Sequence, residues 1–177
     1  GPQLILQLSD RVLHREKALE KGIALLKEGR VLAVKGIGGY HFACLPTSRA
    51  AVEALRTLKQ RDKKPFAVLF PSPESIREVC RVSPEEEALL TSPARPIVLL
   101  EKIRDVFVEG VGGESRFVGA FLPYTPLQQL LTDACGRLVM TSANLSGQPV
   151  ITEDRRMLSM TSPHLAGVLY HSRRILT

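Results

Sequence analysis

The apolar residues of this chain recur either at helical spacing or in short continuous runs. Between residues 14 and 29 they fall every three or four positions, which predicts an amphipathic helix that ends at Gly29. A second helix is expected after Thr47 or Ser48, because a hydroxyl residue there precedes an apolar face. Two more helices begin with serine, proline and glutamate, a typical N-terminal pattern. These two start at residues 72 and 83, and the remaining predicted helices cover 126–134 and 153–160.

Short β-branched or continuous apolar runs between these helices predict strands. They cover 31–34, 40–44, 66–70, 97–100, 117–122, 138–140 and 168–171. Because strands and helices alternate irregularly, the pattern favours an α/β fold with a twisted sheet of mixed parallel and antiparallel strands, flanked by helices. The glycine-rich, charged segment 102–116 is predicted to be a mobile loop or lid.

Composition narrows the class of protein without naming a function. A chain of 177 residues can bury a core without disulfides or metals, and residues 3–172 are expected to form a single domain, with Gly1 and Pro2 as a cloning remnant. The three cysteines are widely spaced and no apolar stretch is long enough to cross a membrane, so we expect a cytoplasmic protein. The net charge of +6 favours anionic partners, although the few aromatic residues argue against a stacking platform for single-stranded nucleic acid.

Three polar clusters lie where predicted strands end, which is where open α/β sheets bind ligands. The first is the loop 35–41, whose glycines would let the backbone approach a ligand closely, although it matches neither common phosphate-binding glycine pattern. A simple turn is the plainer interpretation. The candidate site residues here are Lys35, Tyr40 and His41. His41 is the one histidine in a candidate site, and no spacing of histidines or carboxylates predicts a metal site.

The second cluster is the cationic run 59–64 at the end of a predicted helix. Cations in the last turn of a helix favour its dipole, so a solvated helix end is one interpretation. If the chain is extended there, Lys59 and Arg61 point the same way and could hold two phosphates, with Lys64 in support. Lysine would supply a point charge and arginine a planar fork, which together suit an asymmetric polyphosphate.

The third cluster follows the strand 138–140 and places hydroxyl and amide groups at a strand end. Such groups, together with exposed backbone N–H groups, often form a site for an anionic or highly oxygenated ligand. Thr141, Ser142 and Asn144 are the candidates, whereas Ser146 could instead cap the next helix. The segment 122–126, which contains Pro123, is expected nearby in the sheet.

Taken in order, these clusters resemble the YrdC-like superfamily. The matching motifs are Y-H-F-A-C at 40–44, K-x-R at 59–61 followed by K-P-F at 64–66, and T-S-A-N-L-S-G at 141–147. The resemblance implies ATP binding, accompanied by Mg²⁺, in a basic concave site, and formation of a carbamoyl-type adenylate with release of pyrophosphate. The residues that it implies are Lys59, Arg61, Lys35 and His41 for catalysis, and Lys59, Arg61, Lys64, Tyr40, Pro123, Thr141, Ser142, Asn144 and Ser146 for nucleotide binding.

The first loop separates two branches of that superfamily. Threonylcarbamoyl-adenylate synthases, which serve tRNA modification, carry P-T-[DE]-T-x-Y-G-L there, whereas this chain has K-G-I-G-G-Y-H-F. That loop and the run L-P-Y-T-P-L at 122–127 instead resemble the YrdC-like domain of hydrogenase-maturation carbamoyltransferases. This resemblance implies the middle domain of a longer polypeptide, with 173–177 as the start of a linker to a carbamoyl-transfer domain.

This branch implies that carbamate, derived from carbamoyl phosphate, reacts with ATP to form carbamoyl adenylate during synthesis of the cyanide ligand of [NiFe] hydrogenases. The implied partners are the flanking domains of the same polypeptide and a downstream maturation protein that accepts the carbamoyl group. Two alternatives stay open at this point. One is a threonylcarbamoyl-adenylate synthase, and the other is a non-catalytic domain that binds double-stranded RNA through its positive charge.

Overall fold

The computed structural model describes residues 3–61, 64–108, 110–111 and 115–172, so the expectations for residues 1–2 and 173–177 lie outside the described residues. Within these ranges, ten strands form one sheet in the order β2-β1-β10-β3-β4-β9-β5-β8-β7-β6. The strands are β1 (Gln3–Gln7), β2 (Val12–His14), β3 (Leu32–Lys35), β4 (Tyr40–Cys44), β5 (Val68–Leu69), β6 (Cys80–Arg81), β7 (Val98–Lys102), β8 (Phe117–Phe121), β9 (Leu138–Ser142) and β10 (Gly167–Ser172).

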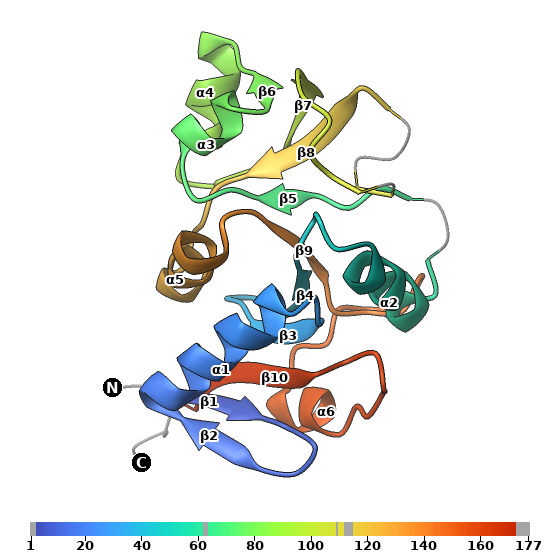
Figure 1. Cartoon of the computed structure of the whole chain (residues 1–177). Coiled ribbons are helices and arrows are strands. Elements are labelled where there is room, and N and C mark those ends of the chain that lie inside the picture. Colours follow the sequence, from blue (N-terminus) through green and yellow to red (C-terminus); the bar gives the residue numbers. More distant parts are fainter. Residues whose placement is uncertain (1–2, 62–63, 109, 112–114, 173–177) are drawn as a thin grey trace.

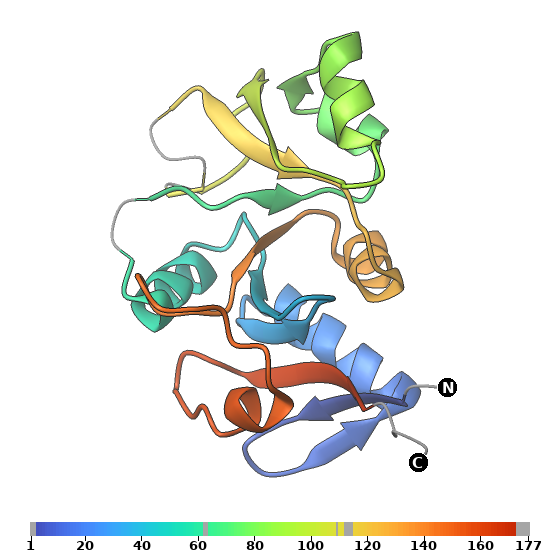
Figure 2. The ribbon, with the colours of Figure 1, turned by 180° about the vertical axis from the view of Figure 1, so that it is seen from behind.

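The sheet combines both strand directions, as the sequence pattern predicts. β10 pairs with β3 in parallel and β5 with β8 in parallel, while the neighbours β3 and β4, and β4 and β9, run antiparallel. The sheet twists strongly, so that β1 and β2 lie at one end of the molecule and β6 and β7 at the other (Figures 1 and 2). The mixed, twisted α/β fold is therefore confirmed.

Helices cover both faces of the sheet. Leu26 of α1 and Leu131 of α5 belong to one buried cluster, and Leu55 of α2 and Ile76 of α3 belong to the cluster on the other face. The helices are α1 (Arg15–Lys27), α2 (Arg49–Lys59), α3 (Pro73–Arg77), α4 (Pro84–Leu90), α5 (Pro126–Cys135) and α6 (Asp154–Leu158). All six fall where the sequence predicts a helix. The bounds of α1, α5 and α6 differ from the predicted ones by at most two residues, and α2, α3 and α4 begin within two residues of their predicted starts.

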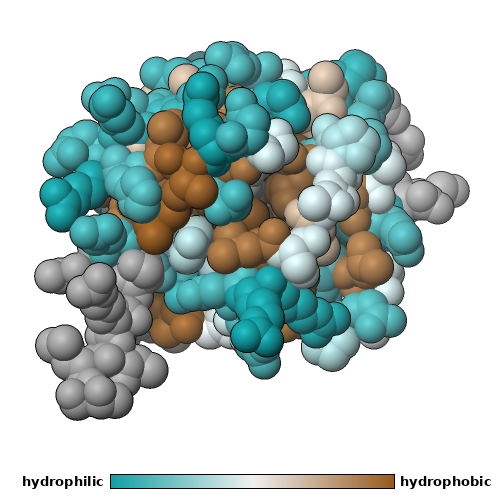
Figure 3. Space-filling view, turned by 90° about the horizontal axis from the view of Figure 1, so that it is seen from below, coloured by the Kyte–Doolittle hydropathy of each residue, from teal (hydrophilic) through white to brown (hydrophobic). Residues whose placement is uncertain are grey.

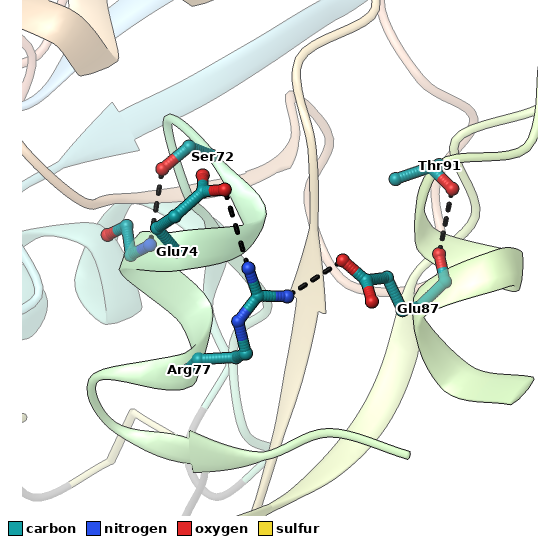
Figure 4. Close-up of polar contacts among 6 residues, drawn as sticks. Ser72, Glu74, Arg77, Glu87 and Thr91 are labelled. Carbon is teal, nitrogen blue, oxygen red and sulfur yellow. Dashed lines mark hydrogen bonds and ion pairs between the residues drawn. The ribbon is translucent and has the colours of Figure 1, made fainter. Parts of the chain in front are cut away.

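The two short helices α3 and α4 begin as their serine-proline-glutamate starts predict. The Ser72 hydroxyl accepts a hydrogen bond from the Ser75 amide at 3.2 Å, and Ser83 forms a reciprocal capping box with Glu86. Arg77 joins the two helices, since its guanidinium contacts Glu74 at 3.4 Å and Glu87 at 2.7 Å (Figure 4). Helices this short depend on such caps and on packing, because they contain too few internal hydrogen bonds to be stable alone.

The sequence pattern misses the hairpin of β1 and β2, and its strand 66–70 is longer than β5. The described residues of segment 102–116, which is predicted to be a mobile loop or lid, contact the rest of the protein. The Val108 amide donates to the Pro46 carbonyl at 3.0 Å, the Arg56 guanidinium donates to the Gly110 carbonyl at 2.6 Å, and Val111 is buried. These contacts fasten the segment to the body of the protein.

The view from the end formed by β1 and β2 shows a mixed surface. Figure 3 shows hydrophobic patches there, separated by hydrophilic residues.

Cys44 and Cys80 are buried free thiols and Cys135 is a partly buried one. No helix within the described ranges combines the length and the apolar character needed to cross a membrane.

Candidate functional site

A cavity of about 620 Å³ lies where the two halves of the sheet meet. One wall comes from β4 and β9, and the other from the chain before β5, the end of β8 and the turn that leads into β7. The polar residues that line it are His41, Arg61, Arg95, Tyr124, Thr141 and Ser142. The cavity therefore brings together residues from all three of the polar clusters identified in the sequence.

Lys59 lies at the base of this wall rather than in the cavity. It is the last residue of α2 and only 1% exposed, and its ammonium donates to Thr141 Oγ1 at 3.2 Å and to Asn144 Oδ1 at 2.8 Å. The Ser142 carbonyl and hydroxyl lie at 2.5 Å and 3.4 Å from the same nitrogen. Burial, followed by the charge of Arg61, lowers the pKa of Lys59 to about 8. Lys59 thus ties α2 to the end of β9 through neutral oxygen atoms.

Arg61 lines the cavity, and contacts with Pro65 and Phe66 fix its side chain. Its guanidinium donates to the Pro65 carbonyl at 2.6 Å, and its Cζ atom lies 4.9 Å from the centre of the Phe66 ring. Arg56 also lies on this ring, at 4.6 Å, and burial followed by the charge of Arg56 lowers the pKa of Arg61. The Nε atom of Arg61 is buried and has no hydrogen-bond partner among the described residues.

The expected geometry of Lys59 and Arg61 is wrong in one respect. The chain between them is not extended, because Gln60 adopts the left-handed conformation (φ 54°) that ends α2. Lys59 consequently points toward β9 while Arg61 turns over Phe66. Arg61 lines the cavity, whereas Lys59 is buried behind Thr141, which also lines it.

His41 is the member of the first loop that reaches the cavity. It pairs with Ser142 across β4 and β9, and its Nε2 atom lies 3.5 Å from the hydroxyl of Tyr124. Burial, followed by the charge of Lys59, lowers its pKa, which favours the neutral imidazole at physiological pH. A neutral histidine can orient a polar ligand but adds no positive charge.

The turn after β9 is organised by Asn144. Its side-chain oxygen accepts from the Ser142 hydroxyl at 2.8 Å as well as from Lys59, and its Nδ2 atom donates to the Gln148 carbonyl at 2.7 Å. Ser146 is exposed, and its amide donates to the Lys59 carbonyl at 3.0 Å. The expectation that Ser146 caps the next helix is wrong, since α6 begins at Asp154 with Glu153 in the N-cap position.

Lys35 and Tyr40 lie on the other face of the sheet, because side chains alternate along β4 and His41 takes the cavity side. The Tyr40 hydroxyl donates to Asp154 Oδ1 at 2.6 Å, and the Lys35 ammonium lies 2.9 Å from the same oxygen. Burial alone would raise the pKa of Asp154, but hydrogen bonds from Tyr40 and Lys35 and the charge of Lys35 lower it overall. The structure does not bring Lys35 and Tyr40 to the cavity.

Two glycines of the first loop, Gly36 and Gly39, are closely packed in this structure. A Cβ atom on Gly39 would lie 2.8 Å from Val150 Cγ1, and one on Gly36 would lie 2.9 Å from the His41 ring. Side chains at these two positions would displace the 150–151 segment or His41. These two glycines therefore affect the site by leaving room for His41 and for the 150–151 segment.

Two predicted residues lie at the margin and two contributors were missed. Lys64 is exposed, and Pro123 lines a smaller adjoining cavity of about 390 Å³ instead of the main one. Tyr124 and Arg95 line both cavities. Tyr124 lies in the L-P-Y-T-P-L run that drew attention to Pro123, whereas no sequence motif singled out Arg95.

A larger cavity, of about 710 Å³, lies at the opposite end of the molecule beside the turn between β1 and β2. Arg11, Lys21 and Arg30 line it together with apolar residues, but none of the three polar clusters contributes to it. Within the described ranges, no group of three or more His, Cys, Asp or Glu side chains is arranged to hold a metal ion. The 620 Å³ cavity is therefore the candidate site.

The family model for telomere recombination proteins of the Sua5, YciO and YrdC type matches residues 24–177. The chain belongs to the Sua5/YciO/YrdC family. Within this family it is 42% identical over 176 residues to the carbamoyltransferase HypF of Rhodobacter capsulatus, covering 99% of this chain and 23% of the relative. The chain thus spans about a quarter of the length of the HypF proteins that it matches.

Other Sua5/YciO/YrdC proteins are more distant in sequence. The chain is 31% identical to the human threonylcarbamoyl-AMP synthase over 134 residues, which cover 75% of this chain and 48% of that protein. Among solved structures, full-length HypF in a phosphate- and nucleotide-bound form superposes with a TM-score of 0.89 at 35% identity, covering 98% of this chain and 23% of that one. Escherichia coli YciO, at 17% identity and a TM-score of 0.70, shares the fold over 82% of this chain and 73% of its own.

Proposed function

We propose that this chain binds ATP in the 620 Å³ cavity and forms carbamoyl adenylate from carbamate. The observation that carries the proposal is the convergence of the Arg61 guanidinium with the Ser142 hydroxyl and a neutral His41 on one cavity wall. Similarity to HypF carbamoyltransferases over nearly the whole chain, and to a HypF structure with bound phosphate and nucleotide, supports this choice. Similarity to threonylcarbamoyl-AMP synthases supports an acyl adenylate as the class of product.

In the proposed step, a carbamate oxygen attacks the α-phosphorus of ATP. The new bond joins that oxygen to phosphorus, and the bond from the α-phosphorus to the bridging oxygen breaks, so that pyrophosphate leaves with the electron pair. No proton has to be removed from the carbamate anion for this attack. The protein therefore has to position the two reactants and to stabilise charge on the phosphoryl oxygens rather than supply a nucleophile.

The cavity residues have distinct tasks in this scheme. Arg61 lines the cavity and presents guanidinium N–H donors to the phosphate oxygens. Thr141 and Ser142 offer hydroxyls at the end of β9, and their orientation is fixed by Lys59 and Asn144. Lys59 thereby acts as a positioning residue that also raises the positive potential beneath the phosphates.

Part of the cavity wall is apolar. Phe66, Ile97, Phe121 and Met140 contribute to it, and an acyl adenylate is readily hydrolysed. The cavity lining includes no aspartate or glutamate among the described residues, so it lacks the carboxylate that usually fixes Mg²⁺ in a protein site. The proposed step accordingly depends on Arg61 and the hydroxyl groups of this chain.

The proposal extends to the setting of the reaction. Carbamate would come from carbamoyl phosphate, and the product would pass to other domains of a longer carbamoyltransferase and then to a hydrogenase-maturation protein for synthesis of the cyanide ligand. The similarity to HypF proteins, of which this chain matches about a quarter, is what supports these partners. An isolated domain that retains its adenylate would release little product, so binding is the primary test.

The first prediction concerns Arg61. Titration calorimetry with ATP is expected to detect binding to the unaltered chain and at least tenfold weaker binding to Arg61→Ala, because charge-assisted hydrogen bonds contribute about 1.5–3 kcal/mol each. Arg81→Ala is the matched control, since Arg81 is exposed and lines neither cavity of the site. Equal affinity of Arg61→Ala and the unaltered chain would refute a role for Arg61 in ATP binding.

The acyl substrate is tested separately by pyrophosphate release from ATP. Ammonium carbamate is expected to stimulate release, and L-threonine with bicarbonate is not. Stimulation by threonine and bicarbonate alone would identify a threonylcarbamoyl-adenylate synthase instead. Tight binding of double-stranded RNA at physiological salt, without any binding of ATP, would refute the enzyme and favour the RNA-binding alternative.

A further inference from the structure

Arg95 occupies an unusual backbone conformation in the turn between α4 and β7. Its φ angle is +47°, a left-handed value that non-glycine residues seldom adopt, and its amide donates to the Ser92 carbonyl at 2.9 Å. Pro93 and Pro96 flank it closely and restrict the turn. Glycine would adopt this conformation without a steric penalty, so the arginine at this position is strained relative to the simplest alternative.

The side chain of Arg95 lies where the two adjoining cavities meet. It lines the main cavity with Arg61 and Ser142, and it lines the 390 Å³ cavity with Pro123 and Thr125. No hydrogen bond or ion pair joins its guanidinium to another side chain in the described ranges, in contrast to Arg77 and Arg137, which pair with glutamates. Arg95 thus places an uncompensated cation at the boundary between the cavities.

We infer that Arg95 is a second polyphosphate-binding residue and that the nucleoside triphosphate extends across both cavities. This inference rests on the ATP site proposed above. Arg61 and Arg95 approach the main cavity from separate segments, one before β5 and one before β7. Two guanidinium groups on different segments can hold phosphates between them, each through a planar pair of donors. The strained turn fixes where the second guanidinium stands.

The position of Tyr124 also indicates that the two cavities are parts of one site. It is the other residue that lines both of them, and its hydroxyl lies 3.5 Å from His41. A ligand that passes between Tyr124 and Arg95 would contact an aromatic ring on one side and a cation on the other. A nucleoside triphosphate combines the flat apolar group and the charged chain that such a passage accommodates.

The test compares three substitutions at one position by calorimetry with ATP and with AMP. Arg95→Ala is expected to weaken ATP binding at least tenfold and AMP binding much less, because AMP lacks the β- and γ-phosphates. Arg95→Lys is expected to recover part of the ATP affinity, since it keeps the charge without the fork. Arg95→Gly is expected to bind ATP as weakly as Arg95→Ala while its melting temperature rises, because the backbone strain is relieved.

The outcomes separate this inference from the proposed function. If the unaltered chain binds no ATP, the proposed function itself fails. If the unaltered chain binds ATP and Arg61→Ala weakens binding, but Arg95→Ala and Arg95→Gly bind as the unaltered chain does, then Arg95 merely shapes the turn and this inference alone is refuted. Equal losses for ATP and AMP would also refute it, because they would place Arg95 away from the β- and γ-phosphates. Arg81→Ala again controls for a general loss of positive charge.

Discussion

Lys59 carries a buried charge with no carboxylate among its described partners. Its ammonium is surrounded by oxygen atoms of Thr141, Ser142 and Asn144, which satisfy its donors but do not neutralise it. Burial of an uncompensated charge is unfavourable, and the lowered pKa of about 8 reflects that cost. A bound polyphosphate would supply the missing negative charge nearby. The residue is therefore suited to a site that is completed by an anionic ligand.

This arrangement makes a prediction about stability and pH. The pKa of Lys59 falls from 10.5 to about 8 on folding, so the unfolded chain binds more protons than the folded one between these values. Stability is therefore expected to rise with pH across that interval, by up to about 1.4 kcal/mol per pH unit from this group. Urea unfolding from pH 7.5 to 10.5, compared with Lys59→Met, measures it.

The variant Lys59→Met keeps the length of the side chain and removes its titration. Its unfolding free energy should lack the rise seen in the unaltered chain, although it loses the hydrogen bonds to Thr141 and Asn144. An identical pH dependence in both proteins would show that another group titrates, and would contradict the lowered pKa of Lys59. Circular dichroism of the variant at neutral pH checks that it folds.

At the residue scale, the types of residue in the site could be predicted but not all of their directions. The motif K-x-R draws attention to Lys59 and Arg61, and Arg61 lines the cavity. Their different directions depend on the left-handed φ angle of Gln60, which the sequence does not signal because glutamine, unlike glycine or asparagine, seldom adopts it. Arg95 was missed for the same reason. Its contribution comes from a left-handed turn and from contacts between distant segments, which local patterns do not encode.

At the scale of elements, long or well-capped segments were the predictable ones. Helices α2, α3 and α4 follow serine caps, and the largely buried strand β4 matches its predicted bounds. The hairpin of β1 and β2 was not predicted, because β2 is only three residues long and its exposure pattern lacks a fully buried position. Its pairing with β10 is a long-range contact that tertiary structure decides.

The alternation of side chains along β4 separates two polar groups that the sequence places side by side. His41 enters the cavity, while Tyr40 on the opposite face joins Lys35 to Asp154 at the start of α6. The Tyr40 amide also donates to the Ile151 carbonyl at 2.9 Å. These contacts attach the chain after β9 to the sheet, so this cluster has a structural role that does not require a ligand.

The element-scale prediction is that Asp154→Ala destabilises the fold without weakening ATP binding. The buried Tyr40 hydroxyl would lose its acceptor, at an expected cost of about 1–3 kcal/mol in the free energy of unfolding. Asp154→Asn keeps an acceptor oxygen and is expected to lose less. Chemical denaturation of both variants, with ATP calorimetry on each, provides the measurement.

The pH dependence of the same cluster has a defined sign. Because the pKa of Asp154 is lowered in the folded protein, its contribution is present above the ordinary value of 3.8 and disappears as the pH falls through the lowered pKa. Asp154→Ala should therefore lose its stability deficit relative to the unaltered chain at strongly acidic pH. A tenfold loss of ATP affinity in folded Asp154→Ala would contradict this prediction. It would show that the cluster of Lys35 and Tyr40 takes part in ATP binding, as the sequence resemblance implies.

At the scale of the whole molecule, the candidate cavity lies where the strand pairing within the sheet is short. β5 and β9 pair through only two residue pairs, Val68 with Val139 and Leu69 with Leu138. In the view of Figure 1, α1 and α5 pack on the sheet below this junction, and α3 and α4 pack above it. A ligand in the cavity would contact both halves, and its binding energy would add to the shared buried core that joins them.

The segment 102–116 has a different position in this architecture from the one predicted. Its described residues reach Pro46, Arg56 and the core, and none of them lines the cavity. The wall that borders the cavity on the β7 side comes from residues 94–97. The structure therefore gives no support for a lid in the described part of 102–116, and it directs attention to the shorter turn around Arg95.

Hydrogen exchange with and without ATP tests this view of the whole molecule. Saturating ATP is expected to slow exchange on both sides of the junction, at the Thr141 and Ser142 amides of β9 and at the Ile97 and Phe121 amides of the other half. Leu6 of β1 is far from the cavity and serves as the internal reference, with exchange changed only as far as global stability rises. Protection confined to one half would contradict a ligand that spans the junction. Selective protection of 102–108 that exceeds that of 94–97 would show that the predicted lid, and not the Arg95 turn, closes over the nucleotide.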